Sequence, residues 1–171
     1  RKEGDHYVLN GSKTFITNGI YGQFVILVCK TNPDAGAAGV SLLVVDLDSP
    51  GISKNKLRKL GWHSSDTAEL HFDDVKVPAK NLLGEEGKGF YYLMGGLQLE
   101  RLAGSIMGYS GCDAVLGYSL QYMSERSAFG RTINKFQVLR QRVAQLSEEI
   151  ESVRFFVLHT FRMHDDGKYA V

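Results

Sequence analysis

One acidic residue, Glu100, stands out because of the residues that share its face of a predicted helix. Residues 90–125 contain no proline and have a helical period. The positions three or four residues from Glu100, and their continuation, are small or apolar: Leu93, Gly96, Leu97, Ala103, Gly104, Met107, Gly108 and Gly111. A glycine inside a helix costs about 1 kcal/mol relative to alanine, so a row of them indicates that something approaches the backbone closely. A flat ligand along this face would partly desolvate Glu100 and make its carboxylate a more effective base.

The residues on this face leave two interpretations open. The glycines could let a second helix pack closely, and Glu100 could form an ion pair with Arg101 or with a more distant cation. Arg101 lies about 100° around the helix from Glu100, so the two side chains need not serve one site. Periodicity alone favours neither the ligand nor the packing interpretation.

Two other segments hold residue types that bind phosphate or stack on a planar ring. Residues 124–131 (SERSAFGR) place two arginines beside the start of a helix, and guanidinium groups match phosphate oxygens. Phe15 and Thr17 are two residues apart on a predicted strand and so share a face, where they could stack on and hydrogen-bond to a planar ligand. Taken singly, the first segment also fits a solvated loop between helices, and the second an ordinary hairpin with a core phenylalanine.

The first half of the chain is typical of β structure. Asn10-Gly11 between short apolar runs predicts a tight hairpin between strands 7–9 and 13–17, and Asn18-Gly19 ends the second strand. Further strands are predicted at 24–30, 40–46 and 67–75. Short strands at regular spacing predict an antiparallel barrel or sandwich.

The second half is typical of long helices. Helices are predicted at about 90–125 and about 136–165, joined by a loop at 127–134. The second helix carries apolar residues at alternating spacings of four and three, which predicts packing on an antiparallel neighbour: Leu139, Val143, Leu146, Ile150, Val153 and Val157. The sequence therefore predicts an α+β protein, with an antiparallel β-barrel or sandwich domain at 1–80. The long antiparallel helices of an up-and-down four-helix bundle follow at 81–171.

The remaining conspicuous side chains are interpreted as structural. A solvated strand face is the expected place of three alternating cations, Lys54, Lys56 and Arg58. Trp62 is expected to be a packing residue. Cys29 and Cys112 are far apart, which favours inert, buried thiols over a disulfide or metal site. No two of the five histidines lie four residues apart, so no metal site is predicted.

Composition limits the classes of partner. The 171 residues are 43% hydrophobic with a formal net charge of +1, so no strong field favours nucleic acid or an anionic membrane. No run of about 18 apolar residues occurs, so no membrane-spanning helix is predicted. Because the sequence starts at Arg1 and stops without a tail, we expect a fragment of a longer protein.

These segments, in their order, resemble the acyl-CoA dehydrogenase family. Residues 7–19 (YVLNGSKTFITNG) resemble its flavin-contacting strand, and residues 60–78 (LGWHSSDTAELHFDDVKVP) resemble the end of its middle β domain. Residues 82–90 (LLGEEGKGF) are similar to the start of its helical domain, and residues 126–130 (RSAFG) with Gln137 to its second FAD-binding motif. The resemblance covers essentially the whole chain.

The resemblance implies an FAD site. Phe15 would lie beside the isoalloxazine ring, where many members have tryptophan, and Thr17 would hydrogen-bond to the flavin near its reactive nitrogen. Arg126 would reach the pyrophosphate of an FAD bound mainly to a neighbouring subunit. The implied cofactor-binding residues are Phe15, Ile16, Thr17, Arg126, Ser127, Ala128, Phe129 and Gln137.

The resemblance also implies a catalytic base. In isovaleryl-type and long-chain-type members this glutamate lies 26 residues before the motif arginine, the position of Glu100 relative to Arg126. The implied reaction is α,β-dehydrogenation of an acyl-CoA thioester to the trans-2-enoyl-CoA, with Glu100 removing the α-proton and the β-hydrogen leaving as hydride to the flavin. The acyl-CoA site would be lined by Leu97, Gln98, Leu99 and Arg101.

The implied partners are an electron-transfer flavoprotein and further copies of the chain in a homotetramer. The implied location is the cytoplasm of a bacterium or, in a eukaryote, the mitochondrial matrix. Two alternatives remain from the sequence: an acyl-CoA oxidase or flavin monooxygenase of the same fold that reacts with oxygen, and a non-catalytic family member.

Overall fold

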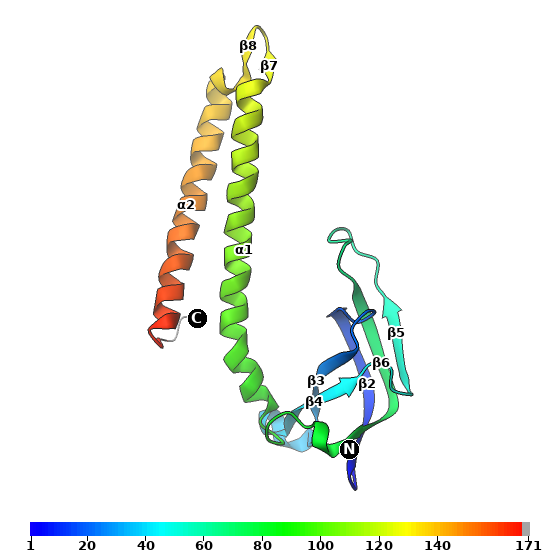
Figure 1. Ribbon diagram of the computed structural model, residues 1–171. Helices are drawn as coiled ribbons and strands as arrows, with labels where there is room; N and C mark the ends of the chain where they lie inside the picture. Colours follow the sequence, from blue (N-terminus) through cyan, green and yellow to red (C-terminus); the bar gives the residue numbers. More distant parts are fainter. Residues whose placement is uncertain (169–171) are drawn as a thin grey trace. The chain divides into compact units, whose positions relative to one another are not determined.

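The structure is a computed structural model that describes residues 1–168 and divides into two compact units. The first unit comprises Arg1–Met94 and the second begins at Gly95. Antiparallel strands build the first unit and long helices the second (Figure 1), which confirms the predicted α+β class. The predicted domain boundary after residue 80 stays a proposal, because helix α1 (Gly89–Glu125) already begins inside the first unit.

Two antiparallel sheets form the first unit. The larger sheet has the order β1–β2–β6–β5, with β1 at Lys2–Glu3, β2 at His6–Thr17, β6 at Thr67–Pro78 and β5 at Ile52–Lys56. The smaller sheet pairs β3 (Phe24–Lys30) with β4 (Val40–Asp46). Two short 3-10 helices complete the unit: η1 (Pro33–Gly39) joins β3 to β4, and η2 (Ala79–Asn81) follows β6.

Alternating apolar residues supply the core of this unit. On β6, Ala68, Leu70 and Phe72 are buried while the residues between them are more exposed. Asp74, at φ 47°, resets the alternation so that Val75 and Val77 are buried as well. The other strands contribute Tyr7, Leu9, Leu27, Leu43 and Val45. Because each buried side chain contributes about 1.5–3 kcal/mol, this layer fixes the position of β2 against β6.

The hairpin predicted at Asn10-Gly11 is wrong. β2 continues through both residues as one strand, and Asn10 faces two residues of β6, Asp73 and Asp74, in a β-bulge. The Asn10 side-chain amide donates to Asp74 Oδ1 (2.9 Å), and the Asp74 backbone N–H donates to Asn10 Oδ1 (3.0 Å). The polar side chain that suggested a turn therefore bridges two strands.

A closed barrel does not form within residues 1–168. Beyond Val8, the outer edge of β2 has no strand partner in this part of the chain, and β3 pairs only with β4. A pocket of about 260 Å³ lies between these two unpaired edges. The predicted barrel or sandwich is therefore present as two antiparallel sheets that are open along this seam.

The segment between β6 and α1 fixes the start of the helix to β4. The Leu83 N–H donates to Leu42 O (2.9 Å), and the Gly87 N–H donates to Ser41 Oγ (2.9 Å). A Cβ added at Gly89 would lie 2.7 Å from the Ser41 carbonyl carbon. Only glycine fits there, so the first turn of α1 is held tightly against the sheet.

Two long helices joined by a short hairpin form the second unit. α1 and α2 (Gln137–Asp165) lie side by side, connected through β7 (Ser127–Ala128), β8 (Arg131–Thr132) and η3 (Ile133–Lys135) (Figure 1). The loop predicted at 127–134 is thus an ordered hairpin. The predicted apolar seam of α2 is only partly covered, because Val157 is buried whereas Val153 is exposed. Within residues 1–168, no helix has the length and apolar character needed to cross a membrane.

Candidate functional site

The strand that carries Phe15 and Thr17 contains a second bulge at this point. Thr14 and Phe15 together face Glu69 of β6, and Phe15 adopts a φ of 63°. The Ile16 side chain packs against the core, whereas Phe15 is 78% exposed and Thr17 is also exposed. Phe15 is therefore not a core residue. Bulges re-aim side chains, and a strained φ costs about 1–3 kcal/mol. Folding alone therefore does not explain why the aromatic ring points outward, and a binding role does.

The turn after Thr17 is fixed by the predicted Asn18-Gly19 pair and by Asp66, which the sequence did not single out. Asn18 has a φ of 60°, and a Cβ added at Gly19 would lie 2.7 Å from the Ala68 Cβ. The buried Asp66 accepts a hydrogen bond at Oδ2 from the Ile20 N–H (2.7 Å). An aspartate just before a strand is a common turn residue, which is the only sequence signal for this role.

Glu100 projects from α1 into an exposed position. Among residues 1–168, no side chain forms a hydrogen bond or ion pair with its carboxylate, and Arg101 has no ion pair either. The ion pair between Glu100 and Arg101 that the sequence left open is therefore absent from this part of the chain. The described residues also do not desolvate Glu100, so a poorly hydrated environment has to come from a ligand or from other parts of the protein.

The glycines on the Glu100 face of α1 leave open space. A Cβ added at Gly96, Gly104, Gly108 or Gly111 would meet no atom within 4 Å. Packing of α1 on α2 therefore does not require glycine at these positions. The surface along this stretch of α1 therefore has room for a flat ligand.

The residues expected to line the acyl-CoA site lie within one turn of Glu100. Leu97 and Gln98 are half-buried, while Leu99 and Arg101 are exposed. The Gln98 Nε2 atom is buried without a hydrogen-bond partner among residues 1–168. Because a buried, unpaired donor costs about 1–3 kcal/mol, a polar group placed beside Gln98 would be stabilised.

The hairpin between the helices brings Arg126 and Gln137 to the same end of the helix pair. The Ile133 N–H donates to Arg126 O (2.8 Å), and β7 pairs with β8 through Ser127 with Thr132 and Ala128 with Arg131. Phe129 (φ 52°) and Gly130 (φ 78°) form the two-residue turn. Two consecutive positive φ angles are what a type I′ hairpin turn needs.

The two arginines at this hairpin differ in their contacts. The Arg131 guanidinium lies 4.4 Å from the centre of the Phe136 ring, a cation–π contact. Phe136 also meets Phe129 edge to face at 6.3 Å, and Phe129 is 95% exposed. Arg126 has no ion pair within residues 1–168. Arg131 is therefore engaged in the hairpin, and Arg126 is the guanidinium that remains for an anion.

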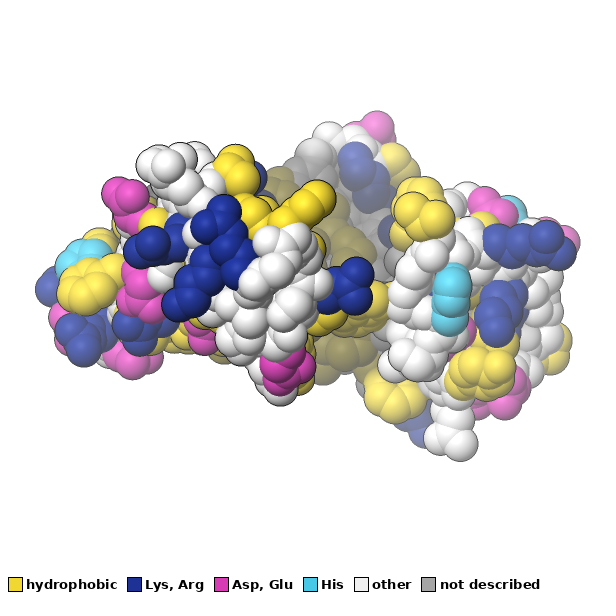
Figure 2. Space-filling model, turned by 90° about the horizontal axis from the view of Figure 1, so that it is seen from above, with side chains coloured by type: hydrophobic (Ala, Val, Ile, Leu, Met, Phe, Trp, Pro, Cys, Tyr) yellow, Lys and Arg dark blue, Asp and Glu magenta, His cyan; other side chains and the backbone are white. Residues whose placement is uncertain are grey.

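An apolar groove of about 950 Å³ runs between the two helices. α1 contributes Gly108, Gly111, Cys112 and Val115, and α2 contributes Ile150 and Phe156 among others. Hydrophobic side chains reach the surface in several places between charged ones (Figure 2). Cys112 is exposed in this groove, so the expectation of two buried thiols is wrong for Cys112.

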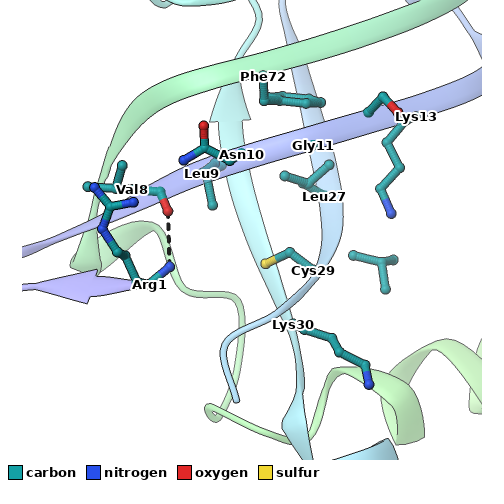
Figure 3. A pocket seen from close by; sticks show the side chains of 12 residues that line it. Arg1, Val8, Leu9, Asn10, Gly11, Lys13, Leu27, Cys29, Lys30 and Phe72 are labelled. Carbon is teal, nitrogen blue, oxygen red and sulfur yellow. Dashed lines mark hydrogen bonds between the residues drawn. The ribbon is translucent and has the colours of Figure 1, made fainter. Parts of the chain in front are cut away.

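The pocket on the open seam of the first unit contains the other cysteine. Figure 3 shows the side chains of Leu9, Leu27 and Cys29 in the gap between β2 and β3, with the Arg1 amino group donating to Val8 O (3.0 Å). Burial raises the pKa of the Cys29 thiol. A raised pKa disfavours the thiolate, which fits the inert thiol expected for Cys29, although its side chain is half-buried rather than buried.

A third cavity, of about 660 Å³, lies at the connection between β5 and β6. Its lining includes Lys56, Arg58, Lys59 and His63. Trp62, in the same connection, is 72% exposed at a φ of 57° and so is not the packing residue expected from the sequence. The alternation of Lys54, Lys56 and Arg58 predicted a solvated strand face but not this cavity. The cavity depends on how the irregular connection 57–66 folds, which a hydrophobic period does not indicate.

The residues predicted to hold FAD suit that cofactor in type and exposure. Phe15 and Thr17 present a ring and a hydroxyl, and the Arg126 guanidinium has no competing partner in the described chain. Ser127, Phe129 and Gln137 are also exposed, whereas Ala128 has no group to donate and Ile16 can contribute only its backbone. Phe15, Ile16 and Thr17 belong to the first unit, and the hairpin residues to the second.

Comparison with known families matches both halves of the chain. The family model described as acyl-CoA dehydrogenase, middle domain, matches residues 1–75. The model described as acyl-CoA dehydrogenase, C-terminal domain, matches residues 87–170. Together the two models cover the chain almost from end to end.

Individual proteins agree with these matches. The mitochondrial long-chain specific acyl-CoA dehydrogenase of Mus musculus is 42% identical over 168 residues, which are 96% of this chain and 39% of that protein. The mitochondrial isovaleryl-CoA dehydrogenase of Pongo abelii is 42% identical over 171 residues, 97% of this chain and 40% of that protein. A crystal structure of acyl-CoA dehydrogenase from Geobacillus kaustophilus has a TM-score of 0.94 at 48% identity and covers 98% of this chain and 45% of its own.

The chain therefore spans about two-fifths of the length of these relatives. Its sheets correspond to the matched middle domain, and its helix pair to the matched C-terminal domain. On these matches, together with the order of its motifs, the chain belongs to the acyl-CoA dehydrogenase family.

Proposed function

We propose that the chain forms part of the active site of an FAD-dependent acyl-CoA dehydrogenase that converts an acyl-CoA thioester into its trans-2-enoyl-CoA. The observation that carries this proposal is the placement of Glu100, which has no ion pair among residues 1–168 and lies on a face of α1 that glycines leave open. The similarity to proteins named long-chain specific and isovaleryl-CoA dehydrogenases supports a base at this position.

Glu100 acts as the base for the α-proton of the thioester. A carboxylate in water is a weak base for a carbon acid, so exclusion of water by the bound acyl chain is what makes Glu100 effective. The thioester carbonyl has to be polarised by hydrogen-bond donors, which makes the α-carbon acidic. FAD, when bound, supplies the two-electron acceptor for the β-hydrogen.

Leu97, Gln98, Leu99 and Arg101 position the substrate around this base. The apolar residues Leu97 and Leu99 suit the acyl portion. The Gln98 Nε2 atom, which has no hydrogen-bond partner among residues 1–168, suits a polar group of the thioester or of the CoA chain. Arg101 is exposed and has no ion pair in the described chain, so its guanidinium is available to bind the anionic CoA.

Phe15, Thr17 and Arg126 hold the cofactor. The Phe15 ring offers a stacking face for the isoalloxazine, the Thr17 hydroxyl offers a donor, and the Arg126 guanidinium offers two parallel donors for a phosphate. The hairpin orients Arg126, because its carbonyl is tied to Ile133 and its neighbours are paired in β7 and β8. Ser127, Phe129 and Gln137 complete the site.

The complete enzyme is a homo-oligomer in this proposal, a tetramer, and passes its electrons to an electron-transfer flavoprotein. The oligomer follows from Arg126 serving the FAD of a neighbouring subunit. The reaction is placed in the cytoplasm of a bacterium or in the mitochondrial matrix of a eukaryote. The mouse and orangutan relatives carry the word mitochondrial in their names, which supports the second location for a eukaryotic chain.

The substitution Glu100→Gln tests the base. It keeps the size of the side chain and removes the proton acceptor, so we expect turnover of acyl-CoA by the holoenzyme to fall by about 10²–10⁴-fold. Binding of acyl-CoA, measured by its perturbation of the flavin spectrum, should change by only a few-fold.

Glu148→Gln is the matched control, because Glu148 is an exposed acid on α2 without an ion pair in the described chain. Its turnover should equal that of the wild type. Near-normal turnover of Glu100→Gln would move the base to another residue and remove the main support for this proposal.

A further inference from the structure

The connection between β5 and β6 concentrates positive charge on a chain whose formal net charge is only +1. Residues 56–65 (KLRKLGWHSS) contain three cations and no carboxylate. Lys56, Arg58 and Lys59 have no ion pair within residues 1–168, and they line the cavity of about 660 Å³. Asp66, the next acid along the chain, is buried and accepts a hydrogen bond from a backbone N–H (2.7 Å). The positive charge of this surface is therefore not neutralised by its own segment, and nothing in the proposed chemistry uses it.

This connection projects from the sheet and is nevertheless ordered. Figure 1 shows it as a loop that extends beyond the end of β5. The Leu57 N–H donates to Thr67 O (2.8 Å), and the Ser65 N–H donates to Trp62 O (3.1 Å). A projecting loop can reach a flat surface that the sheet behind it does not touch. An ordered loop also loses little conformational entropy when it binds.

Large apolar and aromatic side chains stand outward among these cations. Leu60 is fully exposed, and Trp62 is mostly exposed while it holds a φ of 57°. Tyr21 is also mostly exposed, and the Lys56 Nζ atom lies 5.8 Å from the centre of its ring. Tryptophan and tyrosine are enriched at the boundary between lipid headgroups and acyl chains. Lysine and arginine suit the same depth, because their aliphatic stems lie along apolar surface while their charged ends reach the headgroups.

This combination of side chains distinguishes a membrane surface from the other anions that three cations could bind. A small anion such as inorganic phosphate would use the cavity but would leave Leu60 and Trp62 in water. An acidic protein would match the cations, but it would need a separate apolar patch for the two exposed side chains. Anionic phospholipids supply phosphates for the cations and an apolar layer for the leucine and tryptophan.

We propose that residues 56–65 dock the protein reversibly on a membrane surface that contains anionic phospholipid. The three cations bind headgroup phosphates, and Leu60 and Trp62 enter the apolar layer beneath them. Three cations and two apolar side chains make a weak anchor, so the docked protein exchanges with the protein in solution. The inference goes beyond the proposed function, because it uses none of the residues assigned to FAD or to acyl-CoA.

Co-sedimentation of the full-length protein with lipid vesicles tests the charges. We expect binding to vesicles of phosphatidylcholine mixed with phosphatidylglycerol, and none to vesicles of phosphatidylcholine alone. The double substitution Lys56→Gln/Arg58→Gln should lower the partition coefficient by about ten-fold at low ionic strength, and the difference should shrink in high salt.

Lys76→Gln/Lys80→Gln is the matched control. It also removes two exposed cations that have no ion pair in the described chain, and both lie near the far end of β6 from the connection. Its binding to the anionic vesicles should equal that of the wild type.

Trp62 reports whether side chains enter the apolar layer. It is the one tryptophan among the 171 residues, and difference spectra between the wild type and Trp62→Phe isolate its emission from any other tryptophan of the full-length protein. With anionic vesicles this emission should shift to shorter wavelength, and lipids brominated on their acyl chains should quench it. Leu60→Ser should weaken vesicle binding by about five-fold at any salt concentration, because it removes an apolar contact.

Each alternative gives a different result. The proposal is overturned if the wild type does not bind the anionic vesicles, if Lys56→Gln/Arg58→Gln binds them as the wild type does, or if the control weakens binding equally. Vesicle binding without a change in Trp62 emission also overturns it. If the vesicles are not bound, loss of inorganic phosphate binding by the double variant, measured by calorimetry, would assign the cavity to a small anion, and loss of polyglutamate binding would assign the surface to an acidic protein. None of these measurements requires turnover, so they are independent of whether the dehydrogenase proposal holds.

Discussion

Phe15 is held in a backbone conformation that phenylalanine seldom adopts, and its ring gains almost no burial in return. Its φ of 63° arises because Thr14 and Phe15 share one position of the ladder opposite Glu69. A strained, exposed aromatic residue is unfavourable for folding and is found mainly where the ring has a task. Stacking on a planar cofactor is the task that we propose for Phe15.

The substitution Phe15→Gly separates folding from cofactor binding. Glycine adopts a positive φ without strain, and little apolar burial is lost, so the free energy of unfolding of the apoprotein should stay within about 1 kcal/mol of the wild type. FAD should dissociate faster, because the stacking face is missing. Urea unfolding followed by circular dichroism measures the first quantity, and loss of flavin absorbance on gel filtration measures the second.

Ile16→Ala is the control for this prediction. The Ile16 side chain packs on the core, so its truncation should lower the free energy of unfolding by about 2–4 kcal/mol. If Phe15→Gly is destabilised as strongly as Ile16→Ala, the Phe15 ring has a structural role and the interpretation of its strain is wrong.

The sequence predicted correctly which side chains share a face of a helix, because that depends only on period and spacing. The Glu100 face could be listed from helical geometry, and its glycines indeed leave open space. The distinction between Arg126 and Arg131 could not be made, because it depends on the ring of Phe136 lying beside Arg131. The hydrogen bond of Asp66 and the exposed position of Trp62 could not be predicted either, since both depend on how one irregular connection folds.

At the scale of elements, the two Asn-Gly pairs show why a local signal can fail. Asn18-Gly19 ends β2 as predicted, with Asn18 at a positive φ. Asn10-Gly11 does not form a turn, because β6 offers β2 a continuous partner and the Asp74 bulge receives the Asn10 side chain. Long-range pairing of two twelve-residue strands outweighs one turn preference.

The start of α1 depends on a contact that the sequence did not reveal. Gly89 lies against the backbone of Ser41 and Leu42. The substitution Gly89→Ala should therefore force the helix start away from β4 and lower the free energy of unfolding by about 1–3 kcal/mol. Urea unfolding followed by circular dichroism measures the change.

Gly117→Ala is the matched control on the same helix. A Cβ at Gly117 would meet no atom within 4 Å, so alanine should raise stability by about 0.5–1 kcal/mol through its better helix propensity. Opposite signs for the two substitutions are the expected outcome. Equal effects would show that the contact between Gly89 and Ser41 does not limit the position of α1.

At the scale of the whole molecule, the order of β and α elements could be predicted but the closure of each layer could not. The α+β class follows from the change of hydrophobic period near residue 90. The barrel and the bundle are incomplete here, because β2 and β3 have unpaired edges and α2 leaves its seam half covered within residues 1–168. A chain that spans about two-fifths of its relatives contains only part of each layer.

The proposed sharing of site residues between neighbouring subunits has a consequence for the oligomer. Our proposal requires Glu100 to act on the substrate of its own subunit and Arg126 to hold the FAD of a neighbour. If so, mixed oligomers of Glu100→Gln and Arg126→Glu subunits should regain activity that neither variant has alone. Half of the sites in each mixed pair combine an intact Glu100 with an intact Arg126, and the other half carry both defects.

Co-expression with two affinity tags isolates these mixed oligomers, and dye-linked turnover per bound FAD measures the recovery. Activity in the doubly tagged fraction, with none in either parent oligomer, supports a cofactor site shared between chains. If Arg126 instead serves its own subunit, every site in the mixed oligomer contains one defect, and the fraction stays inactive. Light scattering first sizes the doubly tagged fraction, to check that subunits with Arg126→Glu assemble. A recovered tetramer without activity contradicts the shared site directly.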